Sequence, residues 1–86
     1  MELSNAIRQR IINLLKVNHL TVKSLADKAN MNVSTLDNFL LGRNKTITLN
    51  ILFIICCGFE ITLKEFFKDK LFENVYDENE RKETAR

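Results

Sequence analysis

The sequence TVKSLADKANMNVSTLDNFLLG, residues 21–42, contains two short helical patterns separated by a break. Thr21 is suited to cap a helix that begins at Val22, because its hydroxyl can accept a hydrogen bond from an unpaired N–H of the first turn. The apolar stripe of this helix is formed by Leu25, Ala26 and Ala29. The pattern predicts a short, one-sided helix over residues 22–29.

The break and the second helix follow directly. Asn30 tolerates left-handed backbone, Met31 can plug the turn with an apolar side chain, and Asn32 is a good N-cap. A helix is therefore predicted from Val33 until Gly42, which takes the left-handed conformation after a helix without steric cost. Its inward positions are Leu36, Phe39 and Leu40, and its outward positions are Val33, Ser34, Asp37, Asn38 and Leu41.

Two helices of this length, joined by a turn with an apolar plug, are typical of the helix-turn-helix motif, whose second helix enters the major groove of DNA. The outward face suits that use. Ser34 and Asn38 are neutral donors and acceptors that can meet base edges, and Asn can bond adenine through two hydrogen bonds. The alternative is a helical hairpin within an all-α bundle that binds nothing.

The composition predicts one small helical domain. The chain has 86 residues, 45% of them apolar, and no proline. The apolar run 51–57 is far shorter than the roughly 20 residues of a membrane span, and the polar start does not resemble a signal peptide. We therefore expect a cytoplasmic protein with no membrane partner.

The charge is unevenly distributed. Residues 1–50 carry seven basic and three acidic side chains, whereas residues 51–86 carry six basic and eight acidic ones. The positive half contains the proposed motif, which favours double-stranded DNA as the partner. A solvated surface of mixed charge is the alternative interpretation.

The cysteines and the histidine give no sign of a metal or catalytic site. Cys56 and Cys57 are adjacent within an apolar run, a spacing that matches no zinc site and favours buried, unreactive thiols. His19 is the only histidine. The sequence therefore predicts no metal, no cofactor and no enzymatic activity.

Three more helices are expected around the motif. The first spans residues 4–17, with a core stripe of Ile7, Ile11, Leu14 and Leu15. Arg8 and Arg10 lie off that stripe and are expected in solvent, with phosphate contact as the alternative.

The fourth helix should begin after Thr48 and end at Gly58, and its wholly apolar interior predicts burial on more than one face. Thr62 and Glu65 form a capping box that starts a fifth helix. The side chains of this helix that close the core are Leu63, Phe66 and Phe67.

The C-terminal region contains the predicted domain boundary and a candidate homodimer interface. We assign residues 1–72 to the DNA-binding domain and residues 73–86 to an extension that is polar and frayed after residue 76. The apolar residues that exceed the needs of the core are Leu71, Phe72, Val75 and Tyr76. They predict a homodimer interface; alternatively, they fold back over the fourth helix and seal the monomer.

The segments LTVKSLADKANMNVSTLDNFLLGRNK and ITLNILFIICCGFEITLKEFF resemble the Cro and lambda-repressor family, also called the xenobiotic-response-element family. The resemblance covers about residues 7–67. Its most specific parts are Leu25-Ala26, Ser34-Thr35-Leu36, Gly42 and the run from Gly58 to Leu63. The resemblance implies an all-α, five-helix, lambda-repressor-like fold.

The resemblance also implies which residues contact DNA. The base-reading positions fall on Val33, Ser34 and Asn38. The backbone-contacting positions fall on Val22, Lys23, Leu41, Arg43 and Lys45. Val22 and Val33 stand where the family commonly has polar residues, which removes one phosphate bond and leaves Val33 an apolar contact, such as a thymine methyl.

A further departure concerns Leu15 and Leu40, which replace an Arg–Glu pair common in the family. Two leucines can replace a buried ion pair without loss of stability.

The function implied is a sequence-specific transcriptional regulator, most simply a dimeric repressor that binds a palindromic operator through helix 33–41. The alternative is an antitoxin-like or anti-repressor module that binds a protein partner, with DNA binding secondary. The apolar residues at positions 22 and 33 keep this alternative open.

Overall fold

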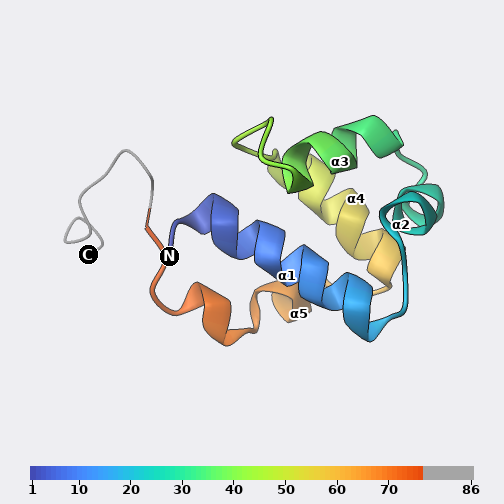
Figure 1. Ribbon diagram of the computed structural model, residues 1–86. Coiled ribbons are helices and arrows are strands. Elements are labelled where there is room, and N and C mark those ends of the chain that lie inside the picture. The colour runs from blue at the N-terminus through green and yellow to red at the C-terminus, as the bar shows by residue number, and fades with distance from the viewer. Residues whose placement is uncertain (77–86) are drawn as a thin grey trace.

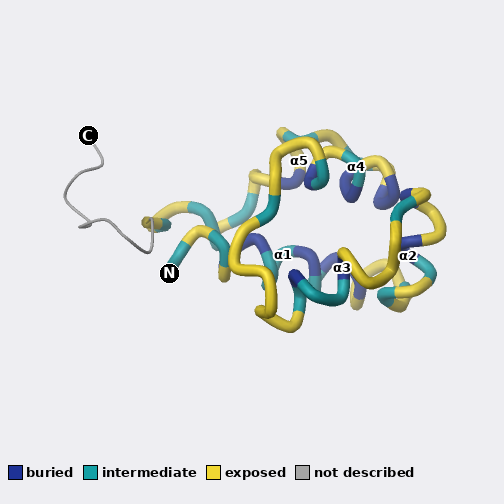
Figure 2. Tube along the Cα trace, turned by 90° about the horizontal axis from the view of Figure 1, so that it is seen from above, coloured by how far each residue is buried: buried dark blue, intermediate teal, exposed yellow. Residues whose placement is uncertain are grey.

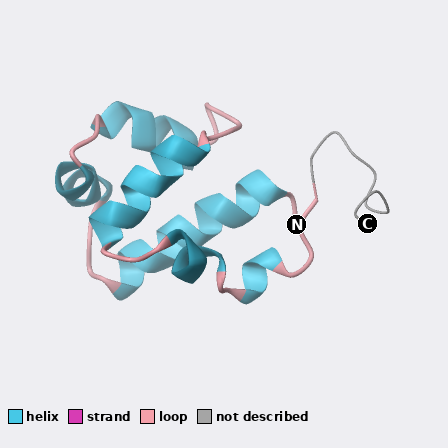
Figure 3. Ribbon diagram, turned by 180° about the vertical axis from the view of Figure 1, so that it is seen from behind, coloured by secondary structure: helices cyan, strands magenta, loops and turns pink. Residues whose placement is uncertain are grey.

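The computed structural model describes residues 1–76, which form helices joined by short loops (Figures 1 and 3). The elements are α1 (Leu3–Val17), α2 (Val22–Ala29), α3 (Val33–Leu40), α4 (Leu49–Phe59), α5 (Leu63–Phe67) and a 3-10 helix, η1 (Lys70–Phe72). The predicted all-α, five-helix fold is confirmed. The frayed end expected after residue 76 lies outside the described residues.

Side-chain caps begin four of the helices where the sequence predicts them. The acceptors are Thr21 Oγ1, Asn32 Oδ1, Thr48 Oγ1 and Thr62 Oγ1, which take the N–H groups of Ser24, Ser34, Ile51 and Glu65 at 2.8–3.1 Å. In α5 the capping box is complete, because Glu65 Oε1 accepts the Thr62 N–H at 3.0 Å. Each cap satisfies a backbone donor that the helix leaves unpaired.

The core is built from all five α-helices. Each contributes a side chain that is at most 1% exposed: Ile11, Leu25, Leu36, Ile55 and Phe66. Figure 2 shows these buried segments turned toward the interior. Helix α1 contacts both α3 and η1, while α5 packs against α4. Figure 1 shows α1 crossing the middle of the fold.

Helix α4 differs from its prediction at the C-terminal end. It continues to Phe59, and the left-handed residue that ends it is Glu60, with φ 62°. Gly58 is buried inside the helix, where an added Cβ would lie 3.0 Å from both Ala29 Cβ and Leu25 Cδ1. The glycine therefore permits close packing of α4 against α2 and does not terminate the helix.

The expectation that α4 is buried on several faces is wrong for one stripe. Leu49 and Phe53 are 65% and 51% exposed. Cys57 is also exposed, whereas Cys56 is buried, so the prediction of two buried thiols is confirmed for Cys56 alone. Burial, together with the neighbouring Cys57, raises the pKa of Cys56 to about 11.

The segment after α5 packs against α1. The ring of Phe72 contacts the rings of Phe67 and Phe66, with centroids 4.8 and 5.8 Å apart. Beyond it, the Leu3 N–H donates to the Tyr76 carbonyl at 2.9 Å in an isolated parallel bridge. The start and the end of the described chain therefore lie side by side (Figure 1).

None of the helices within residues 1–76 combines the length and apolar character that crossing a membrane requires.

Candidate nucleic-acid interface

The turn between α2 and α3 has the predicted construction. Asn30 adopts a left-handed conformation with φ 55°, and the Met31 N–H donates to the Ala26 carbonyl at 2.9 Å. The Met31 side chain packs, partly buried, against the core. This plug fixes α3 relative to α2.

The first turn of α3 is open to solvent. Val33 is 42% exposed, and Ser34 and Thr35 are exposed as well. On the opposite side, Leu36 and Phe39 are 1% and 2% exposed and anchor the helix in the core. The predicted base-reading positions 33 and 34 therefore lie on a surface that can enter a groove.

Asn38, the third predicted base-reading residue, is half-buried in the second half of α3. Its Oδ1 accepts a hydrogen bond from Arg43 Nη1 at 3.3 Å. In a contact with adenine through two hydrogen bonds, this oxygen would accept from the base amino group, and its second lone pair allows it to keep the bond from Arg43. The structure thus brings together two of the sequence-predicted site residues.

Gly42 ends α3 as predicted. Its φ is 82°, its N–H donates to the Phe39 carbonyl at 3.1 Å, and the Arg43 N–H donates to the Asn38 carbonyl at 2.9 Å. This is the Schellman pattern, in which two carbonyls of the last turn are satisfied. The chain then reverses into the loop of residues 43–46, all exposed.

Arg8 is half-buried and bonded within the fold, whereas it was expected in solvent. Its Nε donates to the Phe39 carbonyl at 2.7 Å, and its Nη2 donates to the carbonyls of Asn44 and Lys45 at 3.0 and 3.1 Å. Its Nη1 donates to Asn5 Oδ1 at 2.8 Å, and the guanidinium lies 4.6 Å from the centroid of the Phe39 ring. The guanidinium therefore joins α1 to the end of α3 and to the loop.

Arg10 is also engaged within the fold, again contrary to expectation. Its Nε and Nη2 donate to the carbonyls of Phe66 and Glu65 at 2.8 and 2.9 Å, and its Nη1 pairs with Asp69 Oδ2 at 3.3 Å. These partners belong to α5 and the start of η1. Arg10 therefore does not contribute to the surface around α3.

The predicted backbone-contacting residues are spread over α2, the end of α3 and the loop. Val22 is half-buried, Leu41 is 59% exposed, and Lys23, Arg43 and Lys45 are exposed. Lys23 also pairs with Asp27 at 3.5 Å. The basic residues nearest α3 in sequence, Arg43 and Lys45, both lie in the loop.

Beside the loop lies a polar hollow of about 380 Å³. It is lined by Glu2, Asn5, Arg8, Gly42 and Lys45. The hollow therefore lies between part of the loop and the first turns of α1.

The predicted dimer residues have mixed exposure. Leu71, Phe72 and Val75 are half-buried, and Tyr76 is 37% exposed. Phe72 packs against the core within the monomer, so it offers less free surface than the sequence suggested.

Groups of three or more His, Cys, Asp or Glu side chains that could hold a metal ion do not occur in the described part of the chain.

Residues 10–70 match the family described as the Cro/C1-type HTH DNA-binding domain. Among curated proteins, no relative matches the chain. A solved structure that is similar is the crystal structure of the prophage Lp1 protein 11, with a TM-score of 0.74 and 24% identity, over 87% of this chain and 100% of that one. At this identity the similarity shows the shared fold alone.

Proposed function

Because the chain belongs to the Cro/C1-type HTH DNA-binding domains, a family of DNA-binding transcription regulators, we propose that it is a repressor that binds a palindromic operator as a homodimer. In this proposal α3 enters the major groove and the loop of residues 43–46 follows the adjacent phosphates. The repressor prevents transcription by covering the promoter.

The observation that carries the proposal is the open first turn of α3, together with the basic loop that follows the last turn of the same helix. Val33 and Ser34 are exposed while Leu36 and Phe39 fix the helix in the core. A rigid helix with an exposed polar and apolar edge can read bases, because Ser can bond base edges and Val can contact a thymine methyl.

Binding to the sugar-phosphate backbone is assigned to the loop and to the start of α2. Arg43 and Lys45 supply positive charge, and Lys23 adds a third cation in the first turn of α2. Such contacts fix the register of α3 on the duplex without reading sequence. They also make affinity depend on salt.

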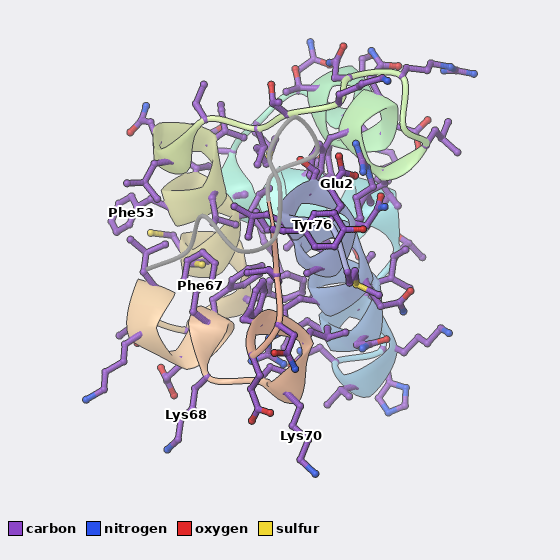
Figure 4. The ribbon with its side chains drawn as sticks, turned by 90° about the vertical axis from the view of Figure 1, so that its left-hand side faces the viewer. Glu2, Phe53, Phe67, Lys68, Lys70 and Tyr76 are labelled. Atoms are coloured by element: carbon purple, nitrogen blue, oxygen red, sulfur yellow. The ribbon has the colours of Figure 1, made fainter. Side chains whose placement is uncertain are left out.

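The dimer is proposed on the face shown in Figure 4, where Phe53 projects from α4, Phe67 from α5, and Tyr76 lies beside Glu2. The exposed fractions of the three aromatic residues are 51%, 37% and 37%. Apolar surface of this kind commonly marks an interface. We include Leu71 and Val75, both half-buried, in the proposed interface. A two-fold dimer there would place two α3 helices about 34 Å apart, one turn of DNA.

The test is selection of bound fragments from random DNA. A repressor of this kind should enrich an inverted repeat whose half-sites are spaced by about one helical turn. Enrichment of a single half-site would support DNA binding and reject the dimer.

The absence of any enriched sequence would instead favour the protein-interaction module. The valines at positions 22 and 33 weaken polar contacts to DNA and are the feature that supports this second candidate. Capture of one stoichiometric protein partner whose binding is lost in a Val33→Asp variant would then be expected.

A further inference from the structure

We infer that Arg8 is a positioning residue for DNA binding: its guanidinium holds the loop after α3 in the conformation that meets phosphates, without contacting DNA itself. The inference rests on the proposed function, since it assigns the loop a role on the phosphate backbone. It concerns a residue of α1, outside the helix-turn-helix.

The hydrogen bonds of Arg8 define the clamp. Three of its four bonds reach backbone carbonyls, those of Phe39, Asn44 and Lys45, and the fourth reaches Asn5. All three guanidinium nitrogens are therefore donating to protein oxygens. Four of the five N–H groups are thus engaged, and a phosphate that binds Arg8 through two hydrogen bonds would have to displace one of these acceptors.

Backbone hydrogen bonds to the last turn of α3 hold one side of the loop. Residues 41–46 are all exposed, and a polar hollow lies beside them. Within the loop, the N–H groups of Arg43 and Asn44 both donate to the Asn38 carbonyl, at 2.9 and 3.1 Å. Arg8 adds the attachment to α1, because it binds the carbonyls on the far side of the same turn.

Electrostatics favour the same arrangement. The last carbonyls of a helix carry partial negative charge, and a cation near them is stabilising. Arg8 donates to the Phe39 carbonyl in the last turn of α3 and stacks over the Phe39 ring. The planar fork of arginine suits several oxygens at once, whereas lysine offers one nitrogen on a flexible stem.

Arg10 supplies a matched comparison within the same helix. It too donates its Nε–H to the carbonyl of the phenylalanine over whose ring it lies, here Phe66, with a guanidinium-to-centroid distance of 5.7 Å. This second clamp holds α5 and η1, not the loop. Removing it should therefore reduce stability without altering the loop.

The first experiment compares Arg8→Met with Arg10→Met, since methionine retains much of the apolar stem. NMR order parameters of the amides at 43–45 in the free protein should fall from roughly 0.85 toward 0.6 in Arg8→Met alone. Affinity for the selected operator should fall about tenfold or more in Arg8→Met and stay unchanged in Arg10→Met at a temperature where both are folded. Equal losses in both variants would overturn the inference.

The second experiment separates positioning from direct phosphate contact. In a background carrying Arg43→Ala and Lys45→Ala, the loop has lost its cations, so Arg8→Met should change affinity by less than about twofold. A full additional loss would show that Arg8 contacts DNA independently and would overturn its positioning role.

Two further variants keep the inference testable if Arg8→Met does not fold. Arg8→Lys should restore folding and give an intermediate loss of affinity, and Asn5→Ala should loosen the clamp mildly. If the wild-type protein binds no DNA, the proposed function fails by itself. The order parameters still test the clamp, and unchanged values at 43–45 in Arg8→Lys and Asn5→Ala would reject it.

Discussion

At the scale of single residues, Asn38 is the side chain on which sequence preference should depend most. Asn38→Ala removes the amide that can bond adenine, so discrimination between operator and random DNA should fall by roughly 1–3 kcal/mol. Competition binding with the two DNAs measures this. Ser34→Ala, one turn earlier, is the control and should have a smaller effect; equal losses on both DNAs would reassign Asn38 to the backbone.

Arg43 and Lys45 should contribute equally to the affinity for all DNA sequences. Each phosphate neutralised contributes about −0.9 to the slope of log affinity against log salt, so Arg43→Ala with Lys45→Ala should reduce the magnitude of the slope by about 1.8 per protomer, or about 3.6 for the dimer. A salt titration of the dissociation constant measures it. Lys28→Ala is the matched control, because Lys28 pairs with Glu60 at 3.2 Å and should leave the slope unchanged.

The two cysteines should differ in reactivity. Cys57 is exposed and Cys56 is buried with a pKa of about 11, so an alkylating reagent at pH 8 should modify Cys57 in the folded protein and reach Cys56 only on unfolding. Mass spectrometry after timed labelling measures the modification of each cysteine.

The stability of the protein should also depend on pH through Cys56. Since the folded pKa of Cys56 lies above its ordinary value of 9.0, its contribution to stability should be complete below pH 9 and be lost as pH rises toward 11.

Residue-level prediction from sequence succeeded where partners are close in the chain. The Thr21 hydroxyl accepts the N–H of Ser24, and the Thr62 hydroxyl accepts the N–H of Glu65. Both hydrogen bonds join residues three positions apart. Arg8 and Arg10 were misplaced because their acceptors, the carbonyls of Phe39 and Phe66, lie 31 and 56 residues away. No local pattern encodes such a contact, and only the tertiary fold brings the groups together.

At the scale of elements, the contact between α2 and α4 depends on the absence of a side chain at Gly58. Gly58→Ala should destabilise the protein by about 1–2 kcal/mol, because the cost of overpacking exceeds the gain in helix propensity. Thermal or denaturant unfolding measures the change. The cost should shrink in an Ala29→Gly background, where the facing methyl is absent; an unchanged cost there would place the strain at Leu25.

The helices themselves were largely predictable. The bounds of α2 follow from Thr21 and Asn30, and the start of α3 follows from Asn32, since capping chemistry is local. The end of α4 was not predicted correctly, because a glycine commonly follows the last turn of a helix and Gly58 was taken for such a residue. Its role in packing against α2 is visible only once the two helices are placed together.

At the scale of the whole molecule, we expect two copies of the protein to associate through the face that carries Phe53, Phe67 and Tyr76 (Figure 4). Phe53→Ser with Tyr76→Ser should convert a dimer to a folded monomer, because it removes apolar side chains from this face and leaves the contacts among the rings of Phe66, Phe67 and Phe72 in place. Sedimentation equilibrium, with circular dichroism for folding, measures this. Val17→Ser, at the C-terminal end of α1 and 74% exposed in the wild-type protein, is the control and should leave the dimer intact.

Phe72 is unsuitable for that test. Its ring packs on Phe66 and Phe67, so its replacement would disturb the monomer as well as any interface. A wild-type monomer at high concentration would rule out this face as a dimer contact. The sequence pattern alone could not show that Phe72 is more buried than Tyr76, because both belong to the same C-terminal group of apolar residues.

The clamp formed by Arg8 has a consequence for how this protein can diversify. Its acceptors at positions 39, 44 and 45 are main-chain oxygens, which every amino acid possesses. Side chains at 44 and 45 can therefore be exchanged, by evolution or in a designed library, while the anchoring of the loop is retained. The strength of binding to the DNA backbone can be varied at these positions on an inherited scaffold, provided that the arginine on α1 is kept.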